Sequence, residues 1–183
     1  MNSLQTFKSI TRPALMKLLG QKNIHQAPAI NKIVVAMGIG SLATRKGVKD
    51  FSDLEKNMAT ITGQKPQTIK SKKSVSNFKL REGMPVMLRV TLRWEKAYDF
   101  IYRLVHITLP RVRDFVWINP KSFDKTWNFT IWLKDQSVFS EIPVDQITTT
   151  MGVQITLVPN SSSSEHNKKL LESLGFIFVN HSK

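Results

Sequence analysis

The chain has 183 residues, of which 41% are hydrophobic, and this is enough for a globular domain with its own core. It carries 27 Lys and Arg against 13 Asp and Glu, and a net charge of +14 on a protein of this size predicts a polyanionic partner. It has no cysteine, which excludes disulfides, thiolate zinc sites and cysteine nucleophiles. No apolar run approaches the roughly 20 residues that a membrane-spanning helix needs.

The positive charge is concentrated in one part of the chain. Residues 1–113 carry 21 basic and 6 acidic side chains, whereas residues 114–183 carry 6 basic and 7 acidic ones. An acid-free stretch between Glu55 and Glu82 holds seven basic residues. This segregation favours a phosphate-binding surface over the plainer alternative of a solvated basic face. The N-terminal segment lacks acids, as mitochondrial transit peptides do, but an amphipathic helix of the mature protein is the preferred interpretation.

The first third of the chain predicts a helix, a strand and a second helix. Apolar residues between Leu4 and Leu19 indicate the first helix, with Pro13 limiting how it begins. The β-branched segment 30–37 predicts a strand. Apolar residues at spacings of three and four over 48–61 predict the second helix, and Gly63 is a plausible C-terminal cap.

The clearest strand follows a short strand and a long basic loop within 66–84. From Val86 to Trp94, apolar residues alternate with Met87, Arg89, Thr91 and Arg93. The apolar side is expected on the core. The other side carries two arginines and a hydroxyl, which suits a surface that lies against RNA.

The second half predicts a helix over 98–109 that stops at Pro110, followed by strands over 127–133 and 153–158. Ser162 and Glu165 have the spacing of a capping box that opens a short helix, and residues 176–179 predict a last strand. The order of elements predicts an α+β fold: one domain over 1–183, a mainly antiparallel sheet, helices on one face, and the other face open for RNA.

No constellation of catalytic or metal-binding residues stands out. The run Met37-Gly38-Ile39-Gly40 lacks the remaining residues of a dinucleotide or P-loop motif. The spacing of the histidines and acids predicts no metal, no cofactor and no enzyme; these residues are His25, His106, His166, His181, Asp114, Asp124, Asp135 and Glu141.

The basic loop over 70–84 is the strongest candidate site. Lysines reach phosphates as point charges, and Ser and Asn add hydrogen bonds to phosphate or sugar. Phe78 either stacks on a base or anchors the loop to the protein, and the anchor is the preferred interpretation because one aromatic ring is no stacking platform. The candidate RNA-contacting side chains of the loop are Lys70, Lys72, Lys73, Ser74, Lys79 and Arg81.

Several runs closely resemble the bacterial and organellar large-subunit ribosomal proteins of the family numbered five. They span most of the chain in order, and they are Met37-Gly38-Ile39-Gly40, Gly63-Gln64-Lys65-Pro66, Lys70-Ser71-Lys72-Lys73-Ser74-Val75, Phe78-Lys79-Leu80-Arg81-Glu82-Gly83, Val90-Thr91-Leu92-Arg93, Leu109-Pro110-Arg111-Val112-Arg113-Asp114-Phe115, Lys121-Ser122-Phe123-Asp124 and, weakly, Met151-Gly152-Val153-Gln154-Ile155-Thr156.

The resemblance implies a structural role in the central protuberance of the large subunit. The open sheet face would bind 5S rRNA, the basic loop would contact P-site tRNA, and large-subunit rRNA and neighbouring ribosomal proteins of the central protuberance would be further partners. The implied rRNA-binding residues are Met37, Gln64, Lys65, Arg89, Thr91 and Arg93. The alternative functions are a free RNA-binding or RNA-chaperone module and a nucleic-acid-processing enzyme.

Two departures from the family pattern stand out. Ala36 replaces the asparagine usual before Met37 and removes a hydrogen bond to RNA. Glycines expected after Phe115 and after Asp124 are replaced by Val116, Trp117, Lys125, Thr126 and Trp127. Trp117 and Trp127 make these segments bulkier than the family pattern and would pack together or meet another protein. This drift is the reason to favour a mitochondrial ribosome over a bacterial or plastid one.

Overall fold

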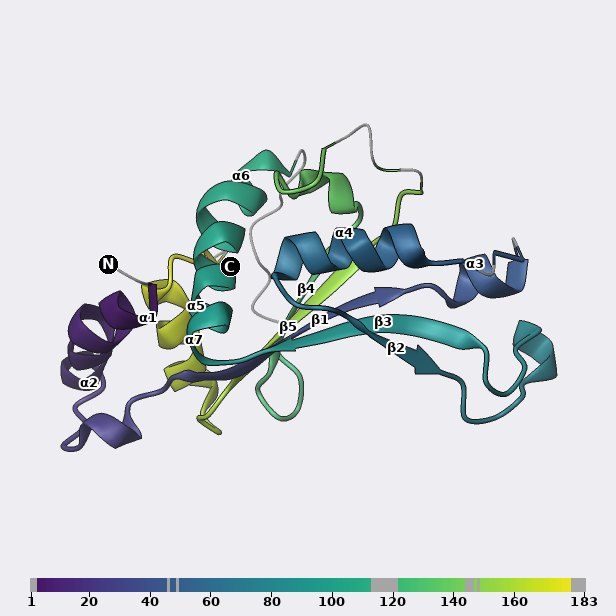
Figure 1. The fold of residues 1–183 in the computed structure, drawn as a ribbon. Helices are drawn as coiled ribbons and strands as arrows, with labels where there is room; N and C mark the ends of the chain where they lie inside the picture. Colours follow the sequence, from purple (N-terminus) through teal and green to yellow (C-terminus); the bar gives the residue numbers. More distant parts are fainter. Residues whose placement is uncertain are drawn as a thin grey trace, which may run out of the picture. The chain divides into compact units, whose positions relative to one another are not determined.

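The computed structural model describes residues 3–45, 47–48, 50–112, 122–143, 147 and 149–178. The described strands form one five-stranded antiparallel sheet with the order β2-β3-β1-β5-β4 (Figure 1). Together with the helices this is the α+β fold that the sequence predicts. The strands are β1 (Ile30–Gly38), β2 (Gln67–Lys70), β3 (Pro85–Leu92), β4 (Phe129–Leu133) and β5 (Val153–Pro159).

The helices alternate with the strands along the chain, and several are interrupted by π or 3-10 turns. They are α1 (Ser3–Thr6), η1 (Phe7–Thr11), α2 (Arg12–Leu18), η2 (Ile24–Gln26), α3 (Gly40–Arg45), α4 (Ser52–Thr62), η3 (Ser76–Phe78), α5 (Trp94–Arg103), η4 (Leu104–Thr108), α6 (Leu109–Arg111), η6 (Gln136–Val138) and α7 (Ser164–Ser173). None of the helices in these described ranges is long and apolar enough to cross a membrane.

Two compact units make up the chain, and each is described by itself. Unit 1 contains residues 1–33, 92–131 and 156–183, and unit 2 contains residues 34–91 and 132–155. The prediction of one domain over the whole chain stays a prediction.

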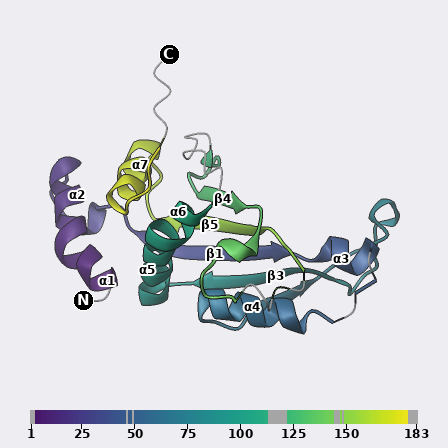
Figure 2. The same ribbon diagram turned by 90° about the horizontal axis from the view of Figure 1, so that it is seen from above.

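Unit 2 is built from α4 and the strand segments beside it. On β3, Leu88 and Val90 are buried while Arg89 is exposed, so the alternation predicted from the sequence is confirmed. The helix α4 buries Leu54, Met58 and Ile61 and lies over one face of these strands, as Figures 1 and 2 show. Gly63 ends it in the left-handed conformation (φ 64°), as predicted. No described helix of this unit covers the opposite face of β3.

In unit 1, the N-terminal helix and α5 pack together at the buried side chain of Tyr98. The helix that begins with α1 packs on α5, and the Phe7 and Tyr98 rings lie 4.6 Å apart. The Ile30 backbone N–H donates to the Tyr98 hydroxyl oxygen at 3.1 Å. Burial raises the pKa of Tyr98 to about 12, so this hydroxyl is neutral at all ordinary pH values.

A cluster of phenylalanine rings forms a second part of the unit 1 core. Phe129 of β4 lies 5.9 Å from the Phe176 ring and 5.7 Å from the Phe178 ring. Of the predicted last strand over 176–179, only Phe178 forms a β-bridge, whereas Phe176 and Ile177 are not in a strand and Val179 lies outside the described residues.

Several boundaries differ from the sequence prediction. The helix predicted over 48–61 begins only at Ser52, as α4. The helix predicted to stop at Pro110 continues as α6 through Arg111, because Pro110 lies in the first turn of α6, where a missing N–H costs no helical hydrogen bond.

Trp94 does not continue the apolar side of β3: it begins α5 and is 77% exposed. Trp127 precedes β4 and lies in a turn. The helix α7 has Ser163 as its N-cap without a side-chain hydrogen bond, so the Ser162–Glu165 capping box is wrong; Glu165 pairs with Lys169 instead, at 3.0 Å.

Candidate nucleic-acid interface

The outward face of unit 2 carries polar side chains on two paired strands. β2 pairs antiparallel with β3, and Gln67 lies opposite Arg89. The Arg89 guanidinium donates to the Gln67 side-chain oxygen at 3.3 Å, which holds an exposed cation over the strands. A guanidinium keeps further N–H donors after one such bond, so Arg89 can still bind a phosphate.

Gln64 and Thr91, which are far apart in sequence, meet beside these strands. The Gln64 side-chain amide donates to the Thr91 carbonyl oxygen at 3.5 Å. Gln64 follows the end of α4, and Thr91 lies near the end of β3 with a half-buried side chain. The contact brings two of the predicted rRNA-binding residues together in unit 2.

The remaining predicted rRNA contacts differ in accessibility. Lys65 is exposed in unit 2, and Arg93 is exposed in unit 1, where it serves as the N-cap residue of α5. The Met37 side chain is completely buried in the core (0% exposed). This value covers the whole residue, so neither the side chain nor the backbone of Met37 is accessible to RNA in this structure. Ala36 is 7% exposed and offers RNA only a small apolar surface.

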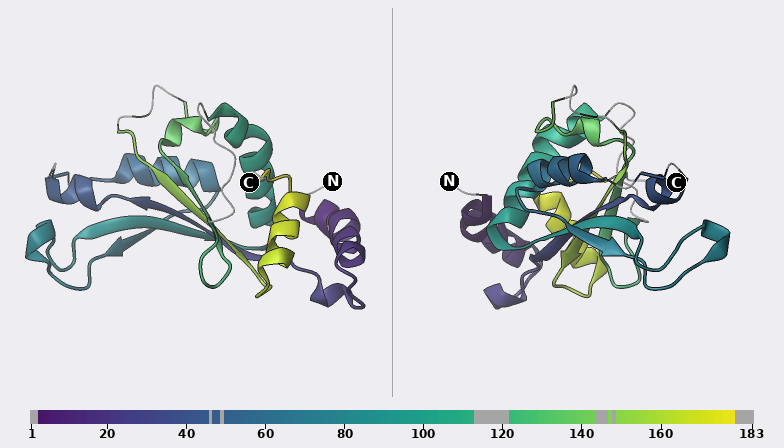
Figure 3. Two further views of the ribbon diagram at one scale, coloured as in Figure 1. Left: turned by 180° about the vertical axis from the view of Figure 1, so that it is seen from behind. Right: turned by 45° about the vertical axis from the view of Figure 1, so that its right-hand side comes forward.

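The basic loop between β2 and β3 extends beyond the ends of these strands (Figure 3) and is held by its own hydrogen bonds. At its base the Ser71 N–H donates to the Met84 carbonyl oxygen at 2.8 Å. Near the tip, Val75 and Leu80 exchange two backbone hydrogen bonds of 2.9 and 3.1 Å. The Ser74 hydroxyl accepts from the Glu82 N–H at 2.9 Å. The side chain of Ser74, which is predicted to contact RNA, thus also stabilises the conformation of the loop.

The basic side chains of this loop point into solvent. Lys70, Lys72, Lys73, Lys79 and Arg81 are all exposed. In the part of the chain that the structure describes, none of them forms an ion pair with a carboxylate. The loop therefore presents a concentrated positive charge that no described side chain of the protein neutralises.

Phe78 lies at the tip of the loop and is 73% exposed. The interpretation of Phe78 as an anchor is wrong, because so exposed a ring makes little contact with the protein. It lines a cleft of about 690 Å³ between α3 and the loop tip, together with Gly40, Ser41, Thr44, Asn77, Lys79, Leu80 and Val86. An aromatic ring, a lysine and hydroxyl groups around one cleft suit a nucleotide.

Sequence reasoning missed the contribution of Gln67 and of α3 to this surface. Gln67 is recognisable only from the register that places it opposite Arg89. Ser41 and Thr44 precede the loop tip by more than thirty residues, and no sequence pattern links them to it. Phe123 and Asp124 belong to the resemblance motifs but lie in unit 1, and Trp117 lies outside the described residues.

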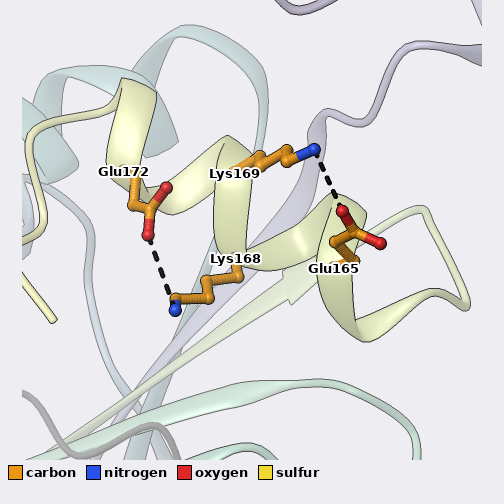
Figure 4. Close-up of polar contacts among 4 residues, drawn as sticks. All are labelled: Glu165, Lys168, Lys169 and Glu172. Carbon is orange, nitrogen blue, oxygen red and sulfur yellow. Dashed lines mark ion pairs between the residues drawn. The ribbon is translucent and has the colours of Figure 1, made fainter. Parts of the chain in front are cut away.

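The lysines of α7 offer a contrast to those of the loop. Lys169 lies 3.0 Å from Glu165 and Lys168 lies 3.9 Å from Glu172, each one helical turn away (Figure 4). The hydrogen bond and the charge of Lys169 lower the pKa of Glu165 below its usual value. Because each lysine is paired with a glutamate, α7 attracts an anion only weakly.

Within the described ranges, no group of three His, Asp or Glu side chains could hold a metal ion. The surface consists of exposed cations, hydroxyls and one aromatic ring, which are groups that bind phosphate, sugar and bases.

Known proteins show the same order of residues over nearly the whole chain. Residues 23–81 match the family Ribosomal protein L5, and residues 85–178 match the model of that family's C-terminus. The chain belongs to the ribosomal protein L5 family. It is 45% identical over 174 residues to the large ribosomal subunit protein uL5 of Thermosipho africanus (95% of each chain), and 43% identical over 177 residues to that of Prochlorococcus marinus strain NATL1A (96% and 98%).

Membership of the L5 family makes this protein a structural, non-enzymatic constituent of the large ribosomal subunit. Its RNA-binding character and its location on the ribosome follow from the same finding. These L5 relatives are bacterial, and the preference for a mitochondrial ribosome finds no support among them.

Proposed function

We propose that the outward face of β2 and β3 in unit 2 binds 5S rRNA. The single observation that carries this proposal is the cluster formed by Arg89, Gln67, Gln64 and Thr91 on a face that no described helix of the unit covers. Gln67, Arg89 and Thr91 lie on strands, and Gln64 is tied to β3 by its hydrogen bond to the Thr91 carbonyl oxygen, so little conformational entropy is lost when RNA binds.

The chemistry of the cluster fits an RNA backbone. Arg89 supplies a guanidinium that can contact phosphate oxygens in a bidentate manner, and Thr91 supplies a hydroxyl. Proteins recognise structured RNA mainly through its shape and through phosphate and 2′-hydroxyl contacts. Ala36 lacks the hydrogen-bonding group of an asparagine, which weakens binding by about 0.5–1.5 kcal/mol relative to the usual family pattern.

Binding of purified full-length protein to 5S rRNA tests this proposal. Arg89→Glu is expected to lower the affinity at least about tenfold, since it places a negative charge against phosphates. Gln64→Ala combined with Thr91→Ala removes two hydrogen-bonding groups and is expected to lower affinity about 5- to 100-fold.

Lys56→Glu is the matched control, because Lys56 is an exposed cation of the same unit on α4, on the covered side of the strands. An equal loss of 5S rRNA affinity in Lys56→Glu and Arg89→Glu would show that only net charge matters and that the face is misplaced. Incorporation of the Gln64→Ala, Thr91→Ala variant into large subunits at the normal level would also contradict the proposal.

We further propose that the basic loop contacts P-site tRNA. The loop is preorganised by the Val75–Leu80 and Ser71–Met84 hydrogen bonds, and its cations lack partners in the described protein. A structured finger with unpaired lysines suits a partner that enters and leaves repeatedly, because charge attraction speeds association without requiring a large buried area.

Ribosomes that carry Lys72→Glu and Lys73→Glu test the loop assignment. The expected result is weaker retention of tRNA in the peptidyl site while 5S rRNA content stays normal. Lys168→Glu and Lys169→Glu on α7 reverse the same number of charges outside the loop and serve as the control. Unchanged tRNA retention with a folded loop variant would contradict the assignment.

A further inference from the structure

Two tryptophans have a backbone conformation that favours glycine. Within the described residues, three non-glycine residues have a positive φ angle, and two of them are Trp94 (φ 51°) and Trp127 (φ 61°). Gly20, Gly47 and Gly63 have φ angles of 63° to 64°, in the same region. A bulky residue in the left-handed region is a clear outlier, because its Cβ crowds the following carbonyl oxygen.

At Trp127 a network of hydrogen bonds imposes this conformation. The Asp124 carboxylate accepts from the Thr126 N–H and the Asn128 N–H, both at 2.8 Å, and from the Asn128 side-chain amide at 2.8 Å. The Trp127 N–H donates to the Asp124 carbonyl oxygen at 3.0 Å. None of these contacts uses the tryptophan side chain, so the turn requires a left-handed residue and does not require an indole.

At Trp94 the backbone turns from strand to helix within one residue. Arg93 is extended (φ −137°) and α5 begins at Trp94. The Trp94 side chain is 77% exposed, so packing does not offset the backbone strain. The third described tryptophan, Trp132 on β4, is also mostly exposed (70%) but has no positive φ angle.

We propose that glycine fills positions 94 and 127 in the protein made by its own cell, because the codon at these positions is read there as glycine and not as tryptophan. UGA is a codon of this kind, since genetic codes exist that read it as tryptophan and others that read it as glycine. The same reading would place glycine at 117 and 132 wherever that codon recurs.

The proposal accounts for two observations that otherwise have no common cause. It explains why tryptophan, with its large side chain, occurs at two left-handed positions. It also explains why tryptophans stand in the segments after Phe115 and Asp124, where the family resemblance leads one to expect glycine. The tryptophans that contributed to the preference for a mitochondrial ribosome then have their origin in decoding, whereas Ala36 does not.

The mass of peptides from the natural protein, purified with ribosomes of its own cells, tests the proposal. Trypsin releases Thr126–Lys134, which spans positions 127 and 132, and cleavage at arginine alone releases Trp94–Arg103. The expected masses are lower than those calculated with tryptophan by one tryptophan-to-glycine difference at each replaced position. Tryptophan at position 94 or at position 127 overturns the proposal, as does a UGG codon at either position in the gene.

Thermal unfolding of recombinant full-length protein gives a second test. Trp94→Gly and Trp127→Gly are each expected to raise the unfolding midpoint by about 2–4 °C, since they relieve left-handed strain. Trp132→Gly is the matched control, because it makes the same chemical change in a strand with ordinary φ and is expected to lower the midpoint. Equal losses in all three variants would overturn the backbone argument.

Discussion

The basic loop between β2 and β3 and the helix α7 both carry lysines, but the two segments use them in different ways. In α7, Lys168 and Lys169 each lie near a glutamate one turn away, and Leu170 and Leu171 are buried beneath them. In the loop, none of residues 72–79 is buried, and no described carboxylate pairs with its cations. The comparison teaches that lysine content alone does not predict a phosphate-binding surface, because the lysines of α7 are paired with glutamates and those of the loop are not paired with any described carboxylate.

The largest expected effect concerns the stability of α7. Leu170 is completely buried, so Leu170→Ala is expected to lower the free energy of unfolding by about 2–5 kcal/mol. Denaturant unfolding measures this loss, and RNA affinity of the remaining folded protein should stay unchanged. A large loss of RNA affinity per folded molecule would contradict the view that α7 stabilises the fold while the basic loop binds RNA.

The next effect concerns the salt dependence of RNA binding. Lys70→Gln, Lys72→Gln and Lys73→Gln together are expected to reduce the slope of log affinity against log salt concentration by about 2–3, because each phosphate contact contributes about 0.7–0.9. Filter binding over a range of salt concentrations measures the slope. Lys168→Gln with Lys169→Gln is the control, and a similar reduction there would show that paired and unpaired lysines are equivalent.

A smaller effect is expected for Phe78 at the tip of the loop, where a substitution can change tRNA affinity without changing stability. Phe78→Ala removes a ring that is 73% exposed, so the free energy of unfolding is expected to change by less than about 0.5 kcal/mol. If a base stacks on Phe78, affinity for tRNA falls by about 1–3 kcal/mol, which calorimetry can measure. Phe78→Tyr, which keeps the ring, should bind as the unchanged protein does.

The smallest effect is a pH dependence of α7. Lys169 lowers the pKa of Glu165, so the stabilisation from this carboxylate is present above the unfolded-state pKa and is lost as pH falls through the lower folded-state pKa. Because Glu165 is fully exposed, the change in stability is expected to be slight. Glu165→Gln should remove this pH dependence in acid thermal melts, and an unchanged profile in the variant would contradict the assignment.

Local patterns in the sequence determined much of the fold. The alternation along β3 predicts which side chains are buried, because a strand exposes every second residue and Leu88 and Val90 must leave water. The three- and four-residue spacing predicts α4, and Gly63 predicts its end. The exposed basic loop follows from its charge, since unpaired lysines are rarely buried.

Only the tertiary structure decided which residues meet. Gln64 contacts Thr91, and α3 shares a cleft with Phe78, because the sheet brings together segments that no local pattern connects. Met37 is buried because of the residues that pack around it, and Trp94 is exposed because β3 has ended and α5 begins there. The alternation of apolar residues in the sequence predicts neither. The left-handed backbone at Trp94 and Trp127 is likewise a property of the tertiary structure. Hydrogen bonds of the Asp124 turn impose it at Trp127, and the change from strand to helix imposes it at Trp94.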